Sequence, residues 1–545
     1  MRILVIGAVA AGTSAAAKAR RNNDQAEIVI YEKDMHISYS GCGLPYFIGG
    51  EIEELDELTP RNPGFFKKKY NIEVQIGHEV MNVNPDKKEI TVKNVQSDET
   101  FVDTYDVLIV STGATPIVPP VKGVDSNHVF FLRNVSSAQR IHDFIETSKP
   151  KSAVVVGTGF IGFEMLENLM NANINVTIVE REAKITPNLD VDMAQFLETT
   201  LVKKGVSIKT NANVAEITSN QVLLADGQAL EADMVIMATG VRPNVELAQS
   251  FGVEIGTTGA IKVNEKMQTN IADVYACGDC IETFSVITNK PVYRPLGSTA
   301  NKTGRIAGDV ATGGSLSYKG NLSTGIFKLF DLAIATTGLS EAEALSEGYD
   351  IEICHNIKPD KPAYFHGKEM VIKAIADRKT QKLLGVQIVG YEGVDKRIDV
   401  FATLITYGAT VDELFHLDLA YAPPFSTTKD PVHYTGMILD NALNHNRPIV
   451  TAAEIAVLNE TQNLQIIDAR VPKQYEAAHV LDAQNMPHSS LREQMASLDK
   501  DVPTVTYCNK GVTGNAAQNI LLSHGFKKVY NLSGGNKFFQ ASKKK

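Results

Sequence analysis

Two cysteines, far apart in the chain, lie in short loops whose residues suit sulfur chemistry. Cys42 lies in the run SYSGCGLPY at residues 38–46, ten residues after Glu32, the acidic end of a nucleotide-binding pattern. Cys508 opens the loop CNKGVTG at residues 508–514. Because a thiolate is the nucleophile in thiol–disulfide exchange, both are candidate catalytic residues. Their occurrence in one chain predicts an enzyme that passes sulfur to a site where it is reduced.

The elements that must position Cys508 follow a strand, loop and helix pattern. The run 504–507 predicts a strand that delivers the cysteine into the loop, and a helix is expected to start near Asn515. Successive backbone N–H groups and the positive end of the helix would stabilise a thiolate or persulfide anion. Lys510 is expected to add positive charge.

Before Cys42 the chain predicts a dinucleotide-binding unit. An apolar strand at 3–6 leads into a turn of small residues that includes Gly7, Ala11 and Gly12, followed by an alanine-rich helix over 13–21. The glycines would let the backbone approach a pyrophosphate, and Glu32, after the next strand at 27–31, would accept from a ribose hydroxyl. Val9 replaces the middle glycine of the usual pattern, so a plain turn between strand and helix remains an alternative.

A second unit matches the complete pattern. The strand 153–156 precedes GTGFIG at 157–162, which supplies Gly157, Gly159 and Gly162, and a helix is expected over 163–171. Glu180 ends the next strand and favours NADH, because it would repel the 2′-phosphate of NADPH. The neighbouring Arg181 weakens that preference, so NADPH stays possible.

A third motif separates the two cofactors. The run TNIADVYACGD at 269–279 resembles the second FAD motif of the pyridine nucleotide-disulfide oxidoreductases, in which the aspartate holds the ribityl chain. Segments 107–113 and 234–240 resemble the crossovers between the FAD and NAD domains of that family. The resemblance implies FAD on the first unit and NAD(P)H on the second. It adds the FAD contacts Thr112, Gly113, Arg133 and Asp279 and the NAD(P)H contact Gly240.

The Cys42 segment resembles the coenzyme A disulfide reductase branch, and in particular its fusions with a rhodanese domain. The run PLGSTANKTGRIA at 295–307 and the segments YAPPFS at 421–426 and KDP at 429–431 share this resemblance. Dithiol members of the superfamily have a second cysteine five residues on, whereas this chain has Phe47, so Cys42 would act alone. The resemblance implies that Tyr421 and Tyr364 reach the sulfur from a partner subunit. It further implies coenzyme A contacts at Arg21, Ser38 and Arg61.

The chain from residue 453 resembles a single rhodanese domain. The matching features are residues 468–470, Tyr475, a structural His479, the Cys508 loop and NLSGG at 531–535. Many rhodaneses have arginine five residues after the cysteine, whereas this chain has Thr513. A low-molecular-weight persulfide is therefore expected as donor in preference to thiosulfate, and the donor itself is not fixed by the sequence.

The other cysteines have more ordinary interpretations. Cys277 and Cys280 form a CxxC that could serve as a zinc or dithiol site, but it overlaps the flavin motif and no second cysteine pair completes a tetrahedral site. Cys354 lies in an apolar run and is expected in a core. No metal is predicted.

Length and composition bound the architecture. The 545 residues predict three or four domains at about 150 residues each. We expect an α/β fold with two Rossmann-like domains, an α+β dimerisation domain and an α/β rhodanese domain. The expected boundaries are 1–150 with 265–319 for FAD, 151–264 for NAD(P)H, 320–440 for dimerisation, 441–452 for a linker and 453–545 for the rhodanese domain.

The net charge of −10 argues against nucleic acid as a partner, and sparse cysteines with no long apolar run predict a cytoplasmic protein with no membrane contact. The resemblance of residues 320–440 to the dimerisation domain of the superfamily implies a homodimer. The predicted reaction is NAD(P)H- and FAD-dependent reduction of coenzyme A persulfide to thiol and hydrogen sulfide, with the rhodanese domain transferring sulfane sulfur to coenzyme A. Three alternatives remain open: a coenzyme A disulfide reductase with an accessory sulfurtransferase, an NADH oxidase or peroxidase, and a C-terminal domain that only senses redox state or docks.

Overall fold

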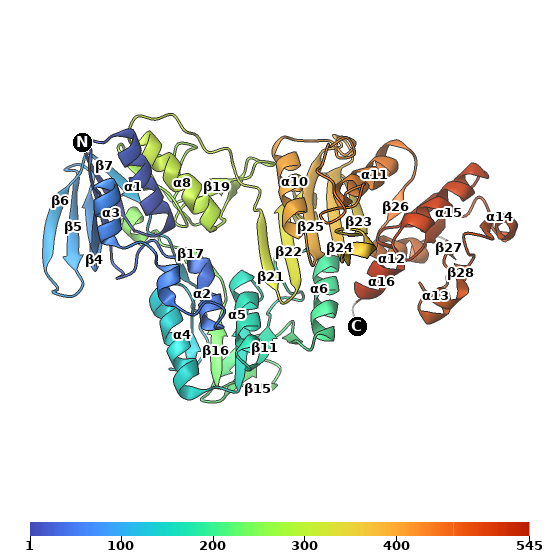
Figure 1. Ribbon diagram of the computed structural model, residues 1–545, viewed down its shortest axis with the longest axis horizontal. Helices are drawn as coiled ribbons and strands as arrows, with labels where there is room; N and C mark the ends of the chain where they lie inside the picture. The colour runs from blue at the N-terminus through green and yellow to red at the C-terminus, as the bar shows by residue number, and fades with distance from the viewer. Residues whose placement is uncertain (462, 544–545) are drawn as a thin grey trace. The chain divides into compact units, whose positions relative to one another are not determined.

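The computed structural model describes residues 1–461 and 463–543 (Figure 1). Residues 462, 544 and 545 of the predicted rhodanese segment lie outside the described residues. Contacts divide the chain into two compact units, Met1–Arg181 with Asn211–Asn321, and Glu182–Thr210 with Leu322–Lys545. Residues 182–210, assigned by the sequence to the NAD(P)H domain, therefore group with the second unit. The predicted α/β fold class is confirmed.

The first unit contains a parallel sheet built on the N-terminal strand. Its strands are apolar runs because both faces of a parallel sheet are covered. Two helices, α1 (Ala10–Asn22) and α8 (Gly297–Val310), pack closely, since a Cβ on Gly304 would lie 2.3 Å from the Ala11 carbonyl oxygen. The sheet order is β18-β7-β1-β2-β3, with bounds β1 (Arg2–Ile6), β2 (Glu27–Glu32), β3 (Glu73–Ile76), β7 (Val107–Val110) and β18 (Val274–Ala276).

A second parallel array repeats this construction in the same unit. The strands β11 (Asn175–Val179), β10 (Ser152–Val156), β16 (Met234–Met237) and β9 (Val129–Phe130) follow one another across the sheet. Helix α5 (Phe160–Asn171) follows β10, and α4 (Val135–Ser148) follows β9. The smaller antiparallel sheets are β4 (His78–Asn84), β5 (Glu89–Asn94) and β6 (Thr100–Thr104); β13 (Val214–Ile217), β14 (Gln221–Leu224) and β15 (Ala229–Glu231); and β8 (Ala114–Pro116) with β17 (Val241–Pro243).

The second unit begins with a five-stranded antiparallel sheet. Its order is β21-β22-β25-β24-β23, and β23 and β24 pair along nine residues each. Helix α11 packs on β23, and α10 packs on β22 and β25. The bounds are β21 (Gly325–Leu329), β22 (Leu332–Gly338), β23 (Ile351–Pro359), β24 (Glu369–Asp377), β25 (Leu383–Gly390), α6 (Val191–Lys203), α9 (Glu341–Ser346), α10 (Val394–Thr406) and α11 (Pro431–Asn444).

The C-terminal part of this unit is a parallel sheet of order β26-β30-β29-β27-β28. Strand β26 pairs with β30, so part of the predicted linker 441–452 belongs to this sheet, and another part completes α11. The bounds are β26 (Ile449–Val450), β27 (Gln465–Asp468), β28 (Gln484–Asn485), β29 (Thr504–Tyr507), β30 (Val529–Leu532), α12 (Ala452–Thr461), α13 (Pro472–Ala477), α14 (Leu491–Gln494), α15 (Val512–Ser523) and α16 (Gly535–Ala541).

Short elements complete the chain. They are the helices α2 (Leu44–Ile48), α3 (Pro63–Tyr70) and α7 (Glu246–Ser250), the strands β12 (Ser207–Lys209), β19 (Thr283–Phe284) and β20 (Pro291–Val292), and the 3₁₀ helices η1 (Gly41–Gly43), η2 (Leu55–Leu58), η3 (Ala363–Phe365) and η4 (Met495–Ser497). Within residues 1–461 and 463–543, no helix is both long and apolar enough to cross a membrane.

Candidate functional site

The first glycine turn is shaped so that another group can come close to its backbone. Gly7 has φ +102°, and a Cβ on Gly12 would lie 1.9 Å from the Gly7 carbonyl oxygen, so neither position tolerates a side chain. The Ala8 N–H donates to Glu32 Oε2 at 2.7 Å. Burial raises the pKa of Glu32, and that backbone donor opposes the shift. Ala11, at the start of α1, is buried beside this turn.

The second glycine turn repeats this geometry. A Cβ on Gly162 would lie 2.0 Å from the Gly157 carbonyl oxygen, whereas one on Gly159 would meet open space. Glu180 Oε2 accepts from the Thr158 N–H at 3.1 Å and from its hydroxyl at 2.5 Å. Each turn thus joins tight glycines, a helix N-terminus and a buried carboxylate at the end of the next strand. This combination fits a dinucleotide at each turn.

The other predicted FAD contacts gather in the same unit. Arg133 Nη2 lies 3.0 Å from Asp279 Oδ2, and the Asp279 carbonyl oxygen accepts from the Tyr293 hydroxyl at 2.9 Å. A Cβ on Gly113 would contact the Arg133 guanidinium at 3.6 Å. The Thr112 hydroxyl donates to the Asn244 carbonyl oxygen at 2.7 Å. Gly240, the predicted NAD(P)H contact, follows β16 with φ +96°.

Cys42 lies in the turn formed by η1 and is exposed. Helix α2 begins two residues later, with Pro45 in its first turn. Although the residue has exposed surface, the surrounding protein desolvates the thiol and raises the pKa of Cys42; Glu164 and Asp279 raise it further, and Arg133 opposes them. Phe47, at the position of the second cysteine in dithiol enzymes, is buried.

Glu164 is a site residue that the sequence analysis missed. It lies in the first half of α5, and α5 packs against α2. Burial, reinforced by the charge of Glu167, raises the pKa of Glu164 to about 7. Burial and the Glu164 charge in turn raise the pKa of Tyr46 to about 12. The available signal was its place two residues after Gly162, in the helix that starts at the second glycine turn.

The predicted coenzyme A contacts are surface residues of the first unit. Arg21 lies exposed in the last turn of α1, and Arg61 lies 5.8 Å from the centroid of the Phe65 ring. Ser38 has φ +47°, and its N–H donates to the Ala8 carbonyl oxygen at 2.8 Å, which places it beside the first glycine turn. Tyr421 and Tyr364 belong to the second unit and are 48% and 70% exposed. Both rings are thus accessible for an approach to another subunit.

The remaining cysteines are buried. Cys354 lies fully buried in β23, opposite Ala374 of β24. Cys280 Sγ contacts the carbonyl oxygens of Cys277 and Val110, and burial raises the pKa of both thiols of the CxxC. Over the described part of the chain, no group of three His, Cys, Asp or Glu residues could hold a metal ion.

The second sulfur site is held by β29, α15 and the turn after β30. Cys508 is buried directly after β29, and the Gly511 N–H donates to its sulfur at 3.2 Å. Helix α15 begins at Val512, three residues earlier than expected. The Asn536 N–H, in the first turn of α16, donates to the Cys508 carbonyl oxygen at 2.9 Å, so the start of α16 holds the loop in place. His479 stacks on the Tyr475 ring at 4.1 Å, consistent with a structural role.

Lys510 does not have the free positive charge that its sequence position suggested. Its ammonium group pairs with Glu369 of β24, which also pairs with Lys537. Burial alone would raise the pKa of Glu369, but the two lysines lower it below its ordinary value. The Cys508 loop is therefore tied to the antiparallel sheet by a carboxylate shared between two lysines.

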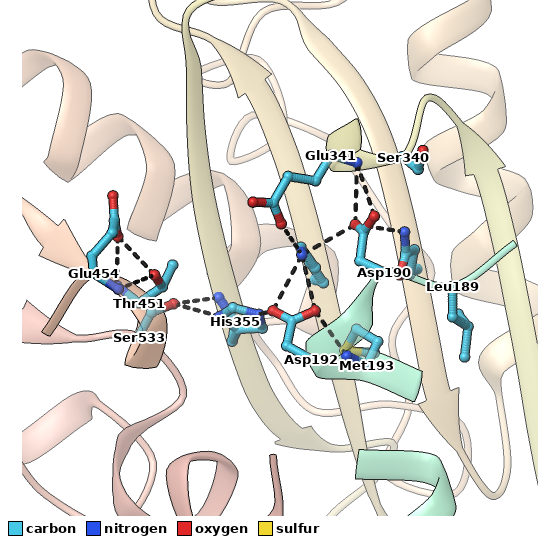
Figure 2. Close-up of polar contacts among 12 residues, drawn as sticks. Leu189, Asp190, Asp192, Met193, Ser340, Glu341, His355, Thr451, Glu454 and Ser533 are labelled. Carbon is cyan, nitrogen blue, oxygen red and sulfur yellow. Dashed lines mark hydrogen bonds and ion pairs between the residues drawn. The ribbon is translucent and has the colours of Figure 1, made fainter. Parts of the chain in front are cut away.

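A buried polar cluster joins α6, the antiparallel sheet and the C-terminal domain (Figure 2). His355 Nε2 lies 2.7 Å from Asp192 Oδ2, and Lys373 Nζ lies 3.0 Å from Asp192 Oδ1. Lys373 is completely buried and also contacts Asp190 at 3.1 Å and Glu341 at 2.7 Å. The sequence analysis did not find this cluster, because its members come from distant segments with no shared motif.

Family models match three consecutive parts of the chain. Residues 1–299 match the pyridine nucleotide-disulphide oxidoreductase model, residues 325–431 match the dimerisation domain of the same family, and residues 451–542 match the rhodanese-like domain. The first match alone covers more than half of the chain.

Three known proteins illustrate the similarity. The NAD(P)H coenzyme A polysulfide/persulfide reductase of Pyrococcus horikoshii is 36% identical over 443 residues, which are 80% of this chain and 98% of that protein. A coenzyme A disulfide reductase of Staphylococcus haemolyticus is 35% identical over 437 residues, with 80% and 98% covered. The crystal structure of reduced CoADR-RHD from Bacillus anthracis superposes with TM-score 0.97 at 37% identity, covering 99% of this chain and 98% of that one.

Proposed function

The chain belongs to the pyridine nucleotide-disulphide oxidoreductase family, and we propose that it reduces coenzyme A persulfide to coenzyme A and hydrogen sulfide with electrons from NAD(P)H. The observation that carries the proposal is one exposed cysteine, Cys42, in the turn η1 of the unit that contains both glycine turns, in a chain that also holds Cys508 in a rhodanese-like domain. The named activity of the Pyrococcus horikoshii relative supports the same reaction.

The two glycine turns supply the cofactor sites. The first turn with Glu32, and Thr112, Gly113, Arg133 and Asp279, would hold FAD, and the second turn with Glu180 and Gly240 would hold NAD(P)H. When bound, FAD carries two electrons from the nicotinamide to a sulfur centre. The carboxylates at both turns accept from backbone N–H groups and so are already oriented at the ends of their strands.

Cys42 performs the sulfur exchange. Its thiolate attacks the persulfide and forms either a mixed disulfide with coenzyme A, releasing hydrosulfide, or a Cys42 persulfide, releasing the coenzyme A thiolate. Two electrons then cleave the new sulfur–sulfur bond and restore the Cys42 thiolate. Because Phe47 takes the place of a second cysteine, no intramolecular disulfide forms in this cycle.

The exposed tyrosines complete the site in a homodimer. Tyr421 and Tyr364 from one subunit would reach the sulfur of the other, where a phenol donates to the leaving sulfur anion. Arg21, Ser38 and Arg61 would hold coenzyme A, because guanidinium groups suit its phosphates. The matched dimerisation domain supports this assembly.

Cys508 supplies the substrate. It would take sulfane sulfur from an outside donor and pass it to coenzyme A, whose pantetheine arm carries it to Cys42. The Gly511 N–H at the Cys508 sulfur supports the charge of a persulfide anion.

A second candidate function is reduction of coenzyme A disulfide, favoured by the 35% identity to the Staphylococcus haemolyticus enzyme. The test is anaerobic NADH oxidation with coenzyme A persulfide and with coenzyme A disulfide, with sulfide measured in the same samples. Faster turnover with one sulfide per NADH from the persulfide supports the proposal. Faster turnover with the disulfide and little sulfide identifies a disulfide reductase. Peroxide turnover without coenzyme A would instead indicate a peroxidase.

A further inference from the structure

Lys358, near the end of β23, is a partly buried cation whose strand partner Met370 follows Glu369, the carboxylate that pairs with Lys510 of the Cys508 loop. Its Nζ lies 3.6 Å from the centroid of the Tyr434 ring, and the Nζ of Lys429 lies 5.5 Å from the same centroid. Two ammonium groups thus share one aromatic ring on α11. Burial lowers the pKa of Lys358, as do the nearby charges of Lys510 and Lys429, whereas the Cys508 thiolate acts in the opposite direction.

The carboxylates around this group are already engaged. Glu369 binds both Lys510 and Lys537, and Asp430 binds the Arg397 guanidinium at 2.8 Å and caps α11. Across residues 1–461 and 463–543, Lys358 and Lys429 make no ion pair with a carboxylate. The face of the Cys508 site formed by the antiparallel sheet therefore carries positive charge that the chain does not neutralise.

We propose that Lys358 and Lys429, held on the Tyr434 ring, form an anion-binding site beside Cys508 for the negatively charged group of a sulfane-sulfur donor. The donor class is a small sulfur compound with its charge close to the transferred sulfur, such as thiosulfate or a carboxylate-bearing persulfide. A bound anion would restore to the Lys358 ammonium group the electrostatic stabilisation that partial burial removes, and the exposed Lys429 would add a second positive charge. This site would perform the task of the arginine that Thr513 replaces, because Lys510, the cation of the loop, is already paired with Glu369.

The transfer step balances without a further reductant. With thiosulfate, the Cys508 thiolate attacks the outer sulfur, the sulfur–sulfur bond breaks, and the products are a Cys508 persulfide anion and sulfite. With an organic persulfide, the same attack gives a Cys508 persulfide and releases the thiolate of the donor. Lys358 and Lys429 hold the donor and take no part in the bond changes.

The inference rests on the proposed transfer of sulfur to Cys508, and its test uses a matched pair of donors. Loading of Cys508 is followed by alkylation and peptide mass spectrometry of the full-length protein. The donors are thiosulfate, the persulfide of 3-mercaptopropionate and the persulfide of 2-mercaptoethanol, which is called the neutral donor because it has no charged group besides the persulfide that all organic donors share. Lys358→Gln should raise the apparent KM for the two anionic donors about tenfold, with the neutral donor changed by less than about twofold. Lys358→Arg should retain most of the affinity for the two anionic donors.

The control is Lys379→Gln, an exposed lysine in the turn at the opposite end of β24, which should change no donor. If Lys358→Gln raises the apparent KM equally for neutral and anionic donors, or raises it for neither, the anion site is refuted. A second readout separates the two proposals: sulfite should protect Cys508 from iodoacetamide in the unaltered protein and not in Lys358→Gln. If sulfite protects Cys508 only when Lys358 is present, but no donor loads Cys508 with sulfur, the anion site stands and the transfer function is refuted. Failure of both readouts refutes both.

Discussion

The side chain and backbone of His355 both bind the hydroxyl of Ser533. The His355 N–H donates to Ser533 Oγ at 2.6 Å, and Nδ1 lies 3.0 Å from the same oxygen (Figure 2). Ser533 begins the turn that leads into α16, and the N–H of Asn536 in that helix donates to the Cys508 carbonyl oxygen. The antiparallel sheet therefore holds the turn that supports the second sulfur site.

Replacing Ser533 with alanine should destabilise the C-terminal domain by about 1–3 kcal/mol, because the buried His355 N–H loses its acceptor. Loading of Cys508 should slow, while reduction of supplied coenzyme A persulfide at Cys42 stays unchanged. Thermal unfolding and the two activity assays measure these effects. Ser497→Ala, an exposed serine of the same domain, should change stability by less than about 0.5 kcal/mol. Equal effects of the two substitutions would contradict the supporting role.

Lys373→Met tests the centre of the buried cluster. The substitution leaves Asp190, Asp192 and Glu341 together without their shared cation, so we expect a loss of about 3–5 kcal/mol in the free energy of unfolding. Urea unfolding of the full chain measures the loss. The exposed Lys379→Met serves as the control. A loss below about 1 kcal/mol would show that the cluster tolerates an apolar residue at its centre.

The same cluster predicts a dependence of stability on acid pH. Burial by itself raises the pKa of Asp192, but His355 and Lys373 lower it overall, far below its ordinary value of 3.8. A carboxyl group with a lowered folded-state pKa contributes its full stability above the unfolded pKa and loses it as the pH falls further. Asp192→Asn should therefore be less stable than the unaltered protein by a constant amount between about pH 5 and 7.

That stability difference should shrink below about pH 4, because the Asp192 carboxyl group becomes protonated in the unfolded chain while it stays ionised in the folded protein. Urea unfolding of both proteins across this pH range provides the comparison. Asp482→Asn, at an exposed loop position, should leave the pH profile unchanged. A difference that stays constant down to pH 3 would show that the ion pairs of Asp192 add nothing to stability.

Much of the fold could be predicted because buried parallel strands are continuous apolar runs. The expected strand at 504–507 agrees with β29 residue for residue, and those at 3–6, 27–31 and 153–156 differ from β1, β2 and β10 by one residue each. Helix starts were predicted less well. Helices α1, α5 and α15 each begin three residues earlier than expected, directly after their glycine turns. The first helical turn has free N–H groups and little apolar periodicity, so the sequence marks it weakly.

The candidate site, like the fold, could be predicted in some parts and not in others. Glycines and acids at fixed spacings, such as Gly7 with Glu32, carry their geometry in the local chain, so a motif could locate them. Lys358 and Glu369 lie next to the Cys508 loop only because the C-terminal domain packs on the antiparallel sheet. No local pattern encodes that contact, and the charge assigned to Lys510 was consequently misjudged.

Cys508→Ser separates the two sulfur sites. Reduction of supplied coenzyme A persulfide should remain within about twofold of the unaltered enzyme, while reduction that starts from an outside donor should be lost, since serine cannot form a persulfide. NADH oxidation and sulfide release with each substrate measure the separation. Cys354→Ser, at a buried cysteine outside both sulfur loops, controls for the loss of a thiol. Equal loss of both activities would refute the division of labour.

Glu164 should set the pH at which Cys42 reacts. Its own pKa is raised to about 7, so it becomes negatively charged near neutral pH, and that charge adds to the burial that raises the pKa of Cys42. Glu164→Gln removes the charge, and the Cys42 thiolate should then form at lower pH. Iodoacetamide labelling of Cys42 in the reduced, flavin-loaded protein, followed by peptide mass spectrometry, gives the profile. The difference between the proteins should grow above pH 7, because Glu164 is largely protonated below it. Glu57→Gln, an exposed position on η2, should leave the profile unchanged, and an unchanged profile for Glu164→Gln would separate Glu164 from the sulfur chemistry.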